Sequence, residues 1–111
     1  MSLQIKLKNF AEQLAAALSG VPVGHYSYYP ADGEAYVVWG EDDEGMPLDG
    51  DDTKQSQVVS GSLDYYTKEE FDPVTDDIQD FFKSNKISFR LNSTQYEDQT
   101  EYIHYEWVFE I

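Results

Sequence analysis

Residues 102–111 read YIHYEWVFEI and carry the clearest structural signal in the chain. Large apolar side chains occupy every second position: Ile103, Tyr105, Trp107, Phe109 and Ile111. The alternate positions, which face the other way, include Tyr102, His104, Glu106 and Glu110. Successive side chains of a strand point to opposite faces, so this pattern predicts a strand with one face in a core and the other in water. A slip of one residue would expose all the apolar side chains, which predicts a firmly fixed register.

Three further stretches also have the character of strands. Residues 87–92 alternate apolar and polar side chains and are joined to 102–111 by a polar turn at 97–99. Residues 58–67 alternate in the same way, with Gly61 marking either a bulge or close packing. Residues 35–39, AYVVW, are apolar on both faces, which predicts a central strand or a strand with one face against another subunit.

Two amphipathic helices are predicted. The first has an apolar stripe at Leu3, Leu7, Phe10, Leu14 and Leu18, and it ends at Gly20 and Pro22. In the second helix, Thr67 and Glu70 have the spacing of a capping box and Asn85 is the expected stop. Its apolar stripe consists of Phe71, Val74, Ile78, Phe81 and Phe82. These elements predict one α+β domain over residues 1–111, with an antiparallel sheet of about four to five strands and both helices packed on one face.

The composition excludes several classes of function. The chain has 111 residues, no cysteine, 22 acidic and seven basic side chains, and a formal net charge of −15. Without cysteine there is no disulfide, zinc-thiolate site or cysteine nucleophile. The acidic excess repels nucleic acid and anionic lipid, so we expect neither specific nucleic-acid binding nor membrane binding. The apolar run 14–18 is too short to span a bilayer, and we expect a protein made in a cytoplasm.

Acidic residues are concentrated between positions 41 and 56, among glycines and a proline. They are Glu41, Asp42, Asp43, Glu44, Asp49, Asp51 and Asp52. Their mutual repulsion predicts a mobile, solvated loop unless a cation or a basic partner neutralises it. The spacing does not match the calcium-binding loop of an EF-hand, so we predict no metal ligands here.

No catalytic arrangement is evident in the sequence. His104 and Glu106 are two positions apart on one strand face and could form an acid–base pair or hold a metal. A histidine beside a glutamate on a strand is more commonly a polar surface or interface pair. Neither histidine is accompanied by a nucleophile motif. We therefore predict no enzyme activity, no catalytic residues and no cofactor.

Aromatic residues make up 15% of the chain, which is more than one small core needs. Tyrosine is favoured at protein interfaces because it combines a large apolar area with a polar tip. We predict that part of this set forms an assembly or partner surface: Tyr26, Tyr28, Tyr29, Tyr36, Trp39, Tyr66 and Tyr102.

Segments from both halves of the chain resemble one known family. In the first half they are the leading helix, 21–23 (VPV), 29–32 (YPAD) and 36–39 (YVVW). In the second half they are 62–68 (SLDYYTK) running into an amphipathic helix, Tyr96-Glu97, Thr100 and 104–107 (HYEW). Together they are similar to the tail-completion proteins of long-tailed bacteriophages and prophages, also called tail terminators, minor tail components or head–tail joining proteins. The large acidic segment has no counterpart in that pattern.

The resemblance implies a structural virion protein with no enzyme activity. Such a subunit is an α+β protein that forms a ring, often of six copies, at the head-proximal end of the tail. The ring stops growth of the tail tube and joins it to the head connector. DNA passes through such a ring, and carboxylates facing the channel would keep the polyanion from binding its wall.

Two other interpretations compete with this one. An acidic DNA mimic would inhibit a host nucleic-acid enzyme, although a mimic is expected to space its acids along rigid elements. A small enzyme would use His104 and Glu106, and its activity would vanish in His104→Ala.

Overall fold

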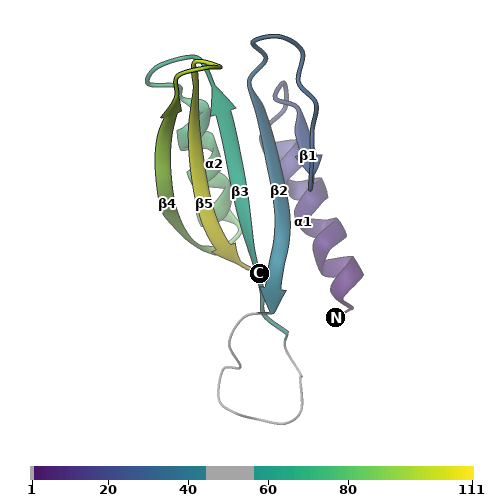
Figure 1. The fold of residues 1–111 in the computed structure, drawn as a ribbon. Coiled ribbons are helices and arrows are strands. Elements are labelled where there is room, and N and C mark those ends of the chain that lie inside the picture. Colours follow the sequence, from purple (N-terminus) through teal and green to yellow (C-terminus); the bar gives the residue numbers. More distant parts are fainter. Residues whose placement is uncertain (1, 45–56) are drawn as a thin grey trace.

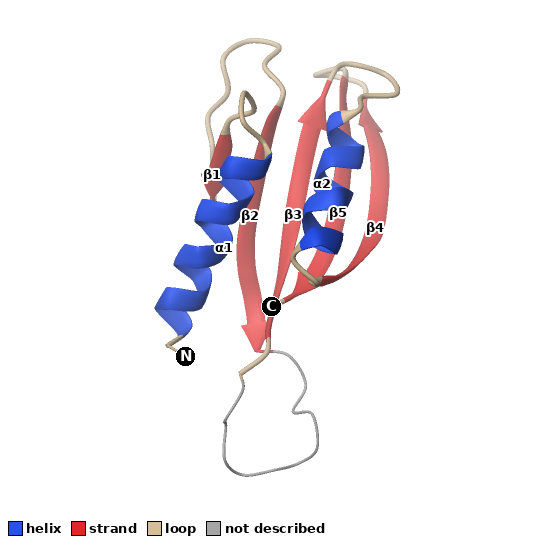
Figure 2. Ribbon diagram, turned by 180° about the vertical axis from the view of Figure 1, so that it is seen from behind, coloured by secondary structure: helices blue, strands red, loops and turns tan. Residues whose placement is uncertain are grey.

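The computed structural model describes residues 2–44 and 57–111, which form two helices and a five-stranded sheet. In chain order the elements are α1 (Leu3–Ala17), β1 (Val23–His25), β2 (Tyr36–Glu44), β3 (Val59–Thr67), α2 (Val74–Ser84), β4 (Ser88–Glu97) and β5 (Tyr102–Glu110). The strands lie in the order β1-β2-β3-β5-β4 (Figure 1). Both helices lie on one face of this sheet (Figure 2). The predicted α+β fold is therefore confirmed.

The sheet is mixed, because β1 runs parallel to β2 while every other neighbouring pair is antiparallel. The predicted antiparallel sheet is present in β2, β3, β5 and β4, and β1 adds one parallel strand at its edge. The connection 26–35 returns from the end of β1 to beyond its start, so β2 runs in the same direction as β1 (Figure 1). β1 comprises only three residues.

Helix α1 packs on the sheet through the stripe that its sequence predicts. Ser2 caps the helix, and its side chain accepts a hydrogen bond from the Ile5 amide. Leu7, Phe10, Leu14 and Leu18 are buried, whereas Leu3 is partly exposed at the free end of the helix. The turn that follows uses Gly20 at a φ of +93°, a backbone conformation that favours glycine.

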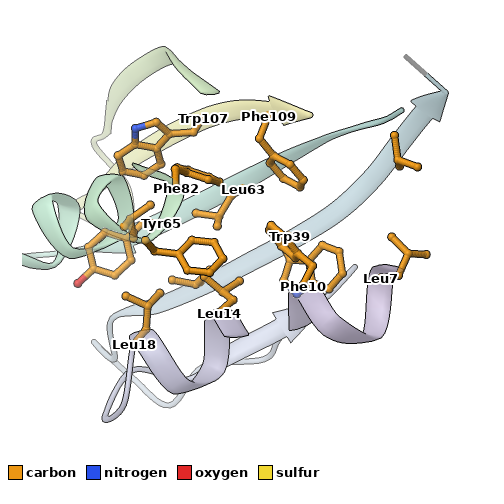
Figure 3. Close-up of a cluster of buried hydrophobic side chains, with 14 residues drawn as sticks. Leu7, Phe10, Leu14, Leu18, Trp39, Leu63, Tyr65, Phe82, Trp107 and Phe109 are labelled. Carbon is orange, nitrogen blue, oxygen red and sulfur yellow. The ribbon is translucent and has the colours of Figure 1, made fainter. Parts of the chain in front are cut away.

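The core lies between the helices and the sheet (Figure 3). Phe10 of α1 stacks on Phe109 of β5 with ring centroids 4.7 Å apart, and it also contacts Trp39 of β2 at 4.7 Å. Trp107 is buried, and its indole N–H donates to the Gln79 side chain of α2 at 3.1 Å. Aromatic side chains from both helices and from the central strands thus lock the layers together.

β5 keeps the predicted register, with Trp107 and Phe109 buried on the helix-covered face. One feature of this strand differs from the prediction of a wet opposite face. Tyr102, which lies on that face, is only 8% exposed. Its hydroxyl donates to the Glu34 carbonyl at 2.8 Å, because the connection before β2 reaches over the end of β5.

Helix α2 begins at Val74, so the predicted capping box at Thr67 and Glu70 was wrong. Thr67 still belongs to β3, and its hydroxyl donates to Asp72 at 2.7 Å. Asp72 provides the start of the helix instead, since its other carboxylate oxygen accepts from the Val74 amide at 2.9 Å. Asp72 is only 6% exposed, so this acidic side chain is buried at the start of the helix.

Phe71 is not part of the apolar stripe of α2. It has a φ of +58°, precedes the helix and is 88% exposed. The remaining stripe packs as predicted, with Ile78, Phe81 and Phe82 buried. Asn85 caps the C-terminus, where its side-chain amide donates to the Phe81 carbonyl at 2.9 Å.

Gly61 marks close packing within β3. A Cβ atom at this position would lie 2.6 Å from the Gly40 carbonyl oxygen and 2.7 Å from Cζ of Phe109. The register irregularity falls on the neighbouring strand, between Glu41 and Asp43 of β2. Of the two roles that the sequence allowed for Gly61, the structure therefore supports close packing.

Candidate functional site

The candidate site is the sheet face opposite the helices, which we call the open face (Figure 1). Alternation along the strands places Tyr36, Asp64, Tyr66, His104 and Glu106 on it. The cross-strand partners run Tyr36 to Tyr66 and Tyr66 to His104, so three strands contribute to one row of rings. Among the described residues, no helix covers this row.

The rings on the open face form a cluster, which we call the open-face aromatic cluster: Tyr28, Tyr36, Tyr66, Tyr102 and His104. Tyr36 stacks on Tyr66 with centroids 4.6 Å apart, and Tyr66 stacks on His104 at 4.2 Å. Tyr102 meets both tyrosines edge-on, at 5.8 and 6.2 Å. Tyr28 lies 5.7 Å from Tyr36. These offset and edge-on contacts hold the rings in fixed positions, which is what a preformed contact surface requires.

Hydrogen bonds from the connection 26–35 fix one end of the cluster. The Glu34 carboxylate accepts from the Tyr28 hydroxyl at 2.8 Å and from the Ala31 amide at 3.1 Å. The Lys68 ammonium lies 5.3 Å from the centre of the Tyr102 ring, a cation–π distance. Tyr102 is therefore enclosed by its own chain and contributes to the rigidity of the surface more than to its area.

Two predicted contact residues are well exposed beyond the cluster. Tyr29 is 90% exposed and Tyr26 is 64% exposed. The Tyr26 hydroxyl donates to Glu41, and its ring stacks on His25 at 3.8 Å. These two tyrosines give the largest predicted aromatic area that a partner can reach.

Trp39 does not belong to a contact surface, and its prediction as one was wrong. It is 2% exposed on the helix-covered face, where it packs against Phe10. Both faces of the predicted strand are apolar because one faces the core and the other carries Tyr36 and Val38 on the open face.

The predicted acidic loop is partly a strand. Glu41, Asp42, Asp43 and Glu44 belong to β2, so the prediction that a mobile loop begins at position 41 was wrong. They continue the pairing of β2 with β3 despite their charge. Asp49, Asp51 and Asp52 lie outside the described residues.

Glu41 is held by two neighbours. His25 Nε2 lies 2.8 Å from its carboxylate, and the Tyr26 hydroxyl donates to the other oxygen. Partial burial acts to raise the pKa of Glu41, but the hydrogen bonds from Tyr26 and His25 outweigh it and hold that pKa below its ordinary value. Glu41 is thus an anchored carboxylate that ties β1 to β2.

The acid–base pairing of His104 with Glu106 that the sequence allowed does not occur. His104 Nε2 lies 2.7 Å from Asp64 of the neighbouring strand, while Glu106 accepts from the Asn92 side chain at 2.7 Å. Burial is the main cause that raises the pKa of Asp64; His104 opposes the shift, and Glu106 and Asp42 add to it. In residues 2–44 and 57–111, no group of three histidine or acidic side chains could hold a metal ion.

Tyr66 is a neutral ring in the middle of the row. Burial, together with the negative charge of Asp64, raises its pKa to about 12. Its phenol therefore remains protonated at neutral pH. The sequence indicated Tyr66 as a surface residue. It did not indicate the contact between Asp64 and His104 beside that ring, because this contact exists only where β3 lies next to β5, and no local pattern shows that order.

Comparison of the chain with protein-family models finds no match, and comparison with curated proteins likewise finds none. In the part of the chain that the structure describes, no helix is long and apolar enough to cross a membrane.

Proposed function

We propose that this chain is a structural subunit of a bacteriophage or prophage virion, of the tail terminator or head–tail joining type. Copies of it form a ring, often six-membered in the family that it resembles, at the head-proximal end of the tail. The ring ends the tail tube and joins it to the head connector. The subunit is made in the cytoplasm of the bacterial host and has no enzyme activity.

The open-face aromatic cluster is the observation that carries this proposal. Rings from three strands are stacked at fixed distances on a sheet face that no described helix covers. Tyr26 and Tyr29 add exposed aromatic area in the connection after β1. Rigid tyrosines of this kind are favoured in protein contacts because little side-chain freedom is lost on binding.

The segments that carry the family resemblance also build this surface. Residues 36–39 supply Tyr36, residues 62–68 supply Asp64 and Tyr66, and residues 104–107 supply His104. The resemblance and the geometry thus point to the same face. Both histidines of the chain are engaged with carboxylates and stacked rings, which favours structural over catalytic roles for them.

Removal of the chain from the phage that encodes it tests the proposal. Lysates made without the chain should contain filled heads and separate tails of irregular length in electron micrographs, and infectious titre should fall by several orders of magnitude. Expression of the wild-type chain from a plasmid should restore normal particles. Finished, correctly attached tails in its absence would contradict the proposed function.

A single exposed tyrosine tests the contact surface. Tyr29→Asp should reduce plasmid rescue of the titre about tenfold or more, because loss of a tyrosine at an interface hot spot costs about 2 kcal/mol or more. Ile5→Asp, at another exposed apolar position, is the matched control and should rescue normally. Thermal unfolding of both purified variants should match that of the wild type. Full rescue by Tyr29→Asp would show that Tyr29 does not contribute to the proposed contact.

The acidic end of β2 would repel DNA in the proposed ring. Glu41 to Glu44 lie on a strand, so their charges have fixed positions relative to the sheet. Placed on the wall of a ring, they would repel the phosphates of passing DNA. A reconstructed ring with these residues on its outer rim and a basic channel would contradict this part of the proposal.

Fixed acids on a strand also favour the second candidate, an acidic DNA mimic that inhibits a host enzyme. The discriminating experiment adds an excess of the purified chain to DNA digestions by nucleases from the host lysate. A structural subunit should leave the cleavage rate unchanged, whereas a mimic should lower it in proportion to its concentration. Inhibition together with normal tails in the deletion strain would establish the mimic.

A further inference from the structure

β4 is the outermost strand on one side of the sheet, next to β5 alone. It spans ten residues, and the backbone groups along its outer side have no neighbouring strand among the described residues. Its central stretch 91–96 (LNSTQY) carries no charge, in a chain whose net charge is −15. Two copies of so acidic a chain repel one another least where such a neutral stretch meets its equivalent.

The opposite edge of the sheet is guarded in ways that β4 is not. β1 has only three residues and is followed by Tyr26 at a φ of +72°, which ends the strand geometry. Beyond β1 the exposed edge of β2 carries Glu41 to Glu44. Short length and charge are devices by which proteins keep edge strands from pairing. The central stretch 91–96 of β4 has neither, although a register shift interrupts the strand between Leu91 and Ser93. This contrast singles out β4 as the edge that accepts another strand.

β4 has chemically complementary ends. The register shift between Leu91 and Ser93 places Arg90 and Glu97 on the open face, paired with Val108 and Tyr102. The same shift places Leu91 and Tyr96 on the helix-covered face, where they are 46% and 59% exposed. An antiparallel second copy in the register that matches these ends brings Arg90 toward the other copy's Glu97, and Leu91 toward its Tyr96.

The surface beside Tyr96 has room for a partner side chain. A hollow of about 680 Å³ is bounded by Thr94, Tyr96, Ile103 and the side chains of Lys68 and Glu101, among others. Ile103 and Tyr96 give it an apolar wall, which suits a leucine side chain. The hollow lies next to the end of β4 that Leu91 of an antiparallel copy approaches.

We propose that two copies of this chain pair through their β4 strands, antiparallel and about a two-fold axis, to form a dimer with one continuous sheet. A two-fold contact of this kind closes on itself, so it covers the neutral edge without starting a fibre. This two-fold contact differs from the head-to-tail contacts between neighbouring subunits of a ring in which all subunits point the same way. The inference does not depend on the proposed function, since it concerns the purified chain.

A charge-swap cycle tests the pairing. The wild-type chain should sediment as a dimer at about 100 μM in 0.15 M salt and dissociate on dilution, because an edge-strand contact is small. Arg90→Glu and Glu97→Arg should each weaken the dimer about tenfold, since each brings like charges together across the two-fold axis. The double variant should recover to within about twofold of the wild type.

The cycle separates pairing from other effects. Arg90 and Glu97 are seven residues apart on one strand, roughly 23 Å, so recovery in the double variant reports a contact between copies. Lys8→Glu changes the net charge as Arg90→Glu does, but on α1, and should leave the dimer unchanged. Circular dichroism of each variant verifies folding. A monomer at 100 μM, single variants that dimerise normally, or a double variant weaker than either single one would each overturn the proposal, whatever the phage experiments show.

Discussion

Replacement of Asp72 by alanine should lower the free energy of unfolding by about 3–5 kcal/mol. Its carboxylate accepts from the Tyr65 hydroxyl at 2.6 Å, the Thr67 hydroxyl at 2.7 Å and the Val74 amide at 2.9 Å. Alanine would leave the first two donors buried without a partner and would remove the cap of α2. Urea denaturation followed by circular dichroism and tryptophan fluorescence measures the loss. The exposed Asp76→Ala is the matched control and should cost less than about 1 kcal/mol.

The pH dependence of this loss identifies its cause. Burial acts to raise the pKa of Asp72, but the hydrogen bonds from Tyr65, Val74 and Thr67 outweigh it, so the pKa is below its ordinary value in the folded chain. The folded state is then favoured by ionised Asp72 above the ordinary aspartate pKa, and this contribution is lost as the pH falls through the folded pKa. The stability gap between wild type and Asp72→Asn should therefore narrow as the pH falls below about 5, through the ordinary aspartate pKa and then through the lower pKa of the folded chain. A gap independent of pH would show that packing, and not the charged hydrogen bonds, carries the effect.

The second large effect is expected at Gly61. Gly61→Ala should lower the free energy of unfolding by about 2–3 kcal/mol, because the new methyl group would overlap the Gly40 carbonyl oxygen and the buried ring of Phe109. Neither neighbour can move without opening the pairing of β2 with β3 or the core. The measurement is again urea denaturation at neutral pH.

Gly40 provides the control for Gly61, since it lies on the neighbouring strand. A Cβ atom there would lie 3.2 Å from the exposed ring of Tyr26, which can rotate away. Gly40→Ala should therefore cost under about 1 kcal/mol. Equal losses at the two positions would contradict the packing argument and indicate a general intolerance of substitution in these strands.

The sequence predicted the elements in which apolar side chains recur at a regular spacing, either that of a strand or that of a helix. β5 and α1 were found because Trp107 and Phe109 alternate with polar residues and because Leu7, Phe10 and Leu14 recur at helical spacing. The start of α2 was misplaced because Thr67 and Glu70 match a capping box, whereas the cap is Asp72, whose partner Tyr65 lies on another element. Local spacing cannot show such a contact.

The candidate site was predictable in composition and not in arrangement. The number of tyrosines indicated a contact surface, but the row Tyr36, Tyr66 and His104 exists only because β3 lies between β2 and β5. His104 was matched with Glu106 by position along one strand, although its partner is Asp64, 40 residues away in the sequence. Trp39 was grouped with the tyrosines as a contact residue because both faces of its strand are apolar, so the sequence did not show which face is buried.

As a proposed structural part of the virion, this chain should be found at the head–tail junction. A cryo-electron microscopy reconstruction of that junction in purified particles, together with mass spectrometry of their proteins, tests this most directly. The reconstruction should show a ring of copies of this α+β fold at the head-proximal end of the tail tube. Purified, infectious particles that lack the chain altogether would contradict it.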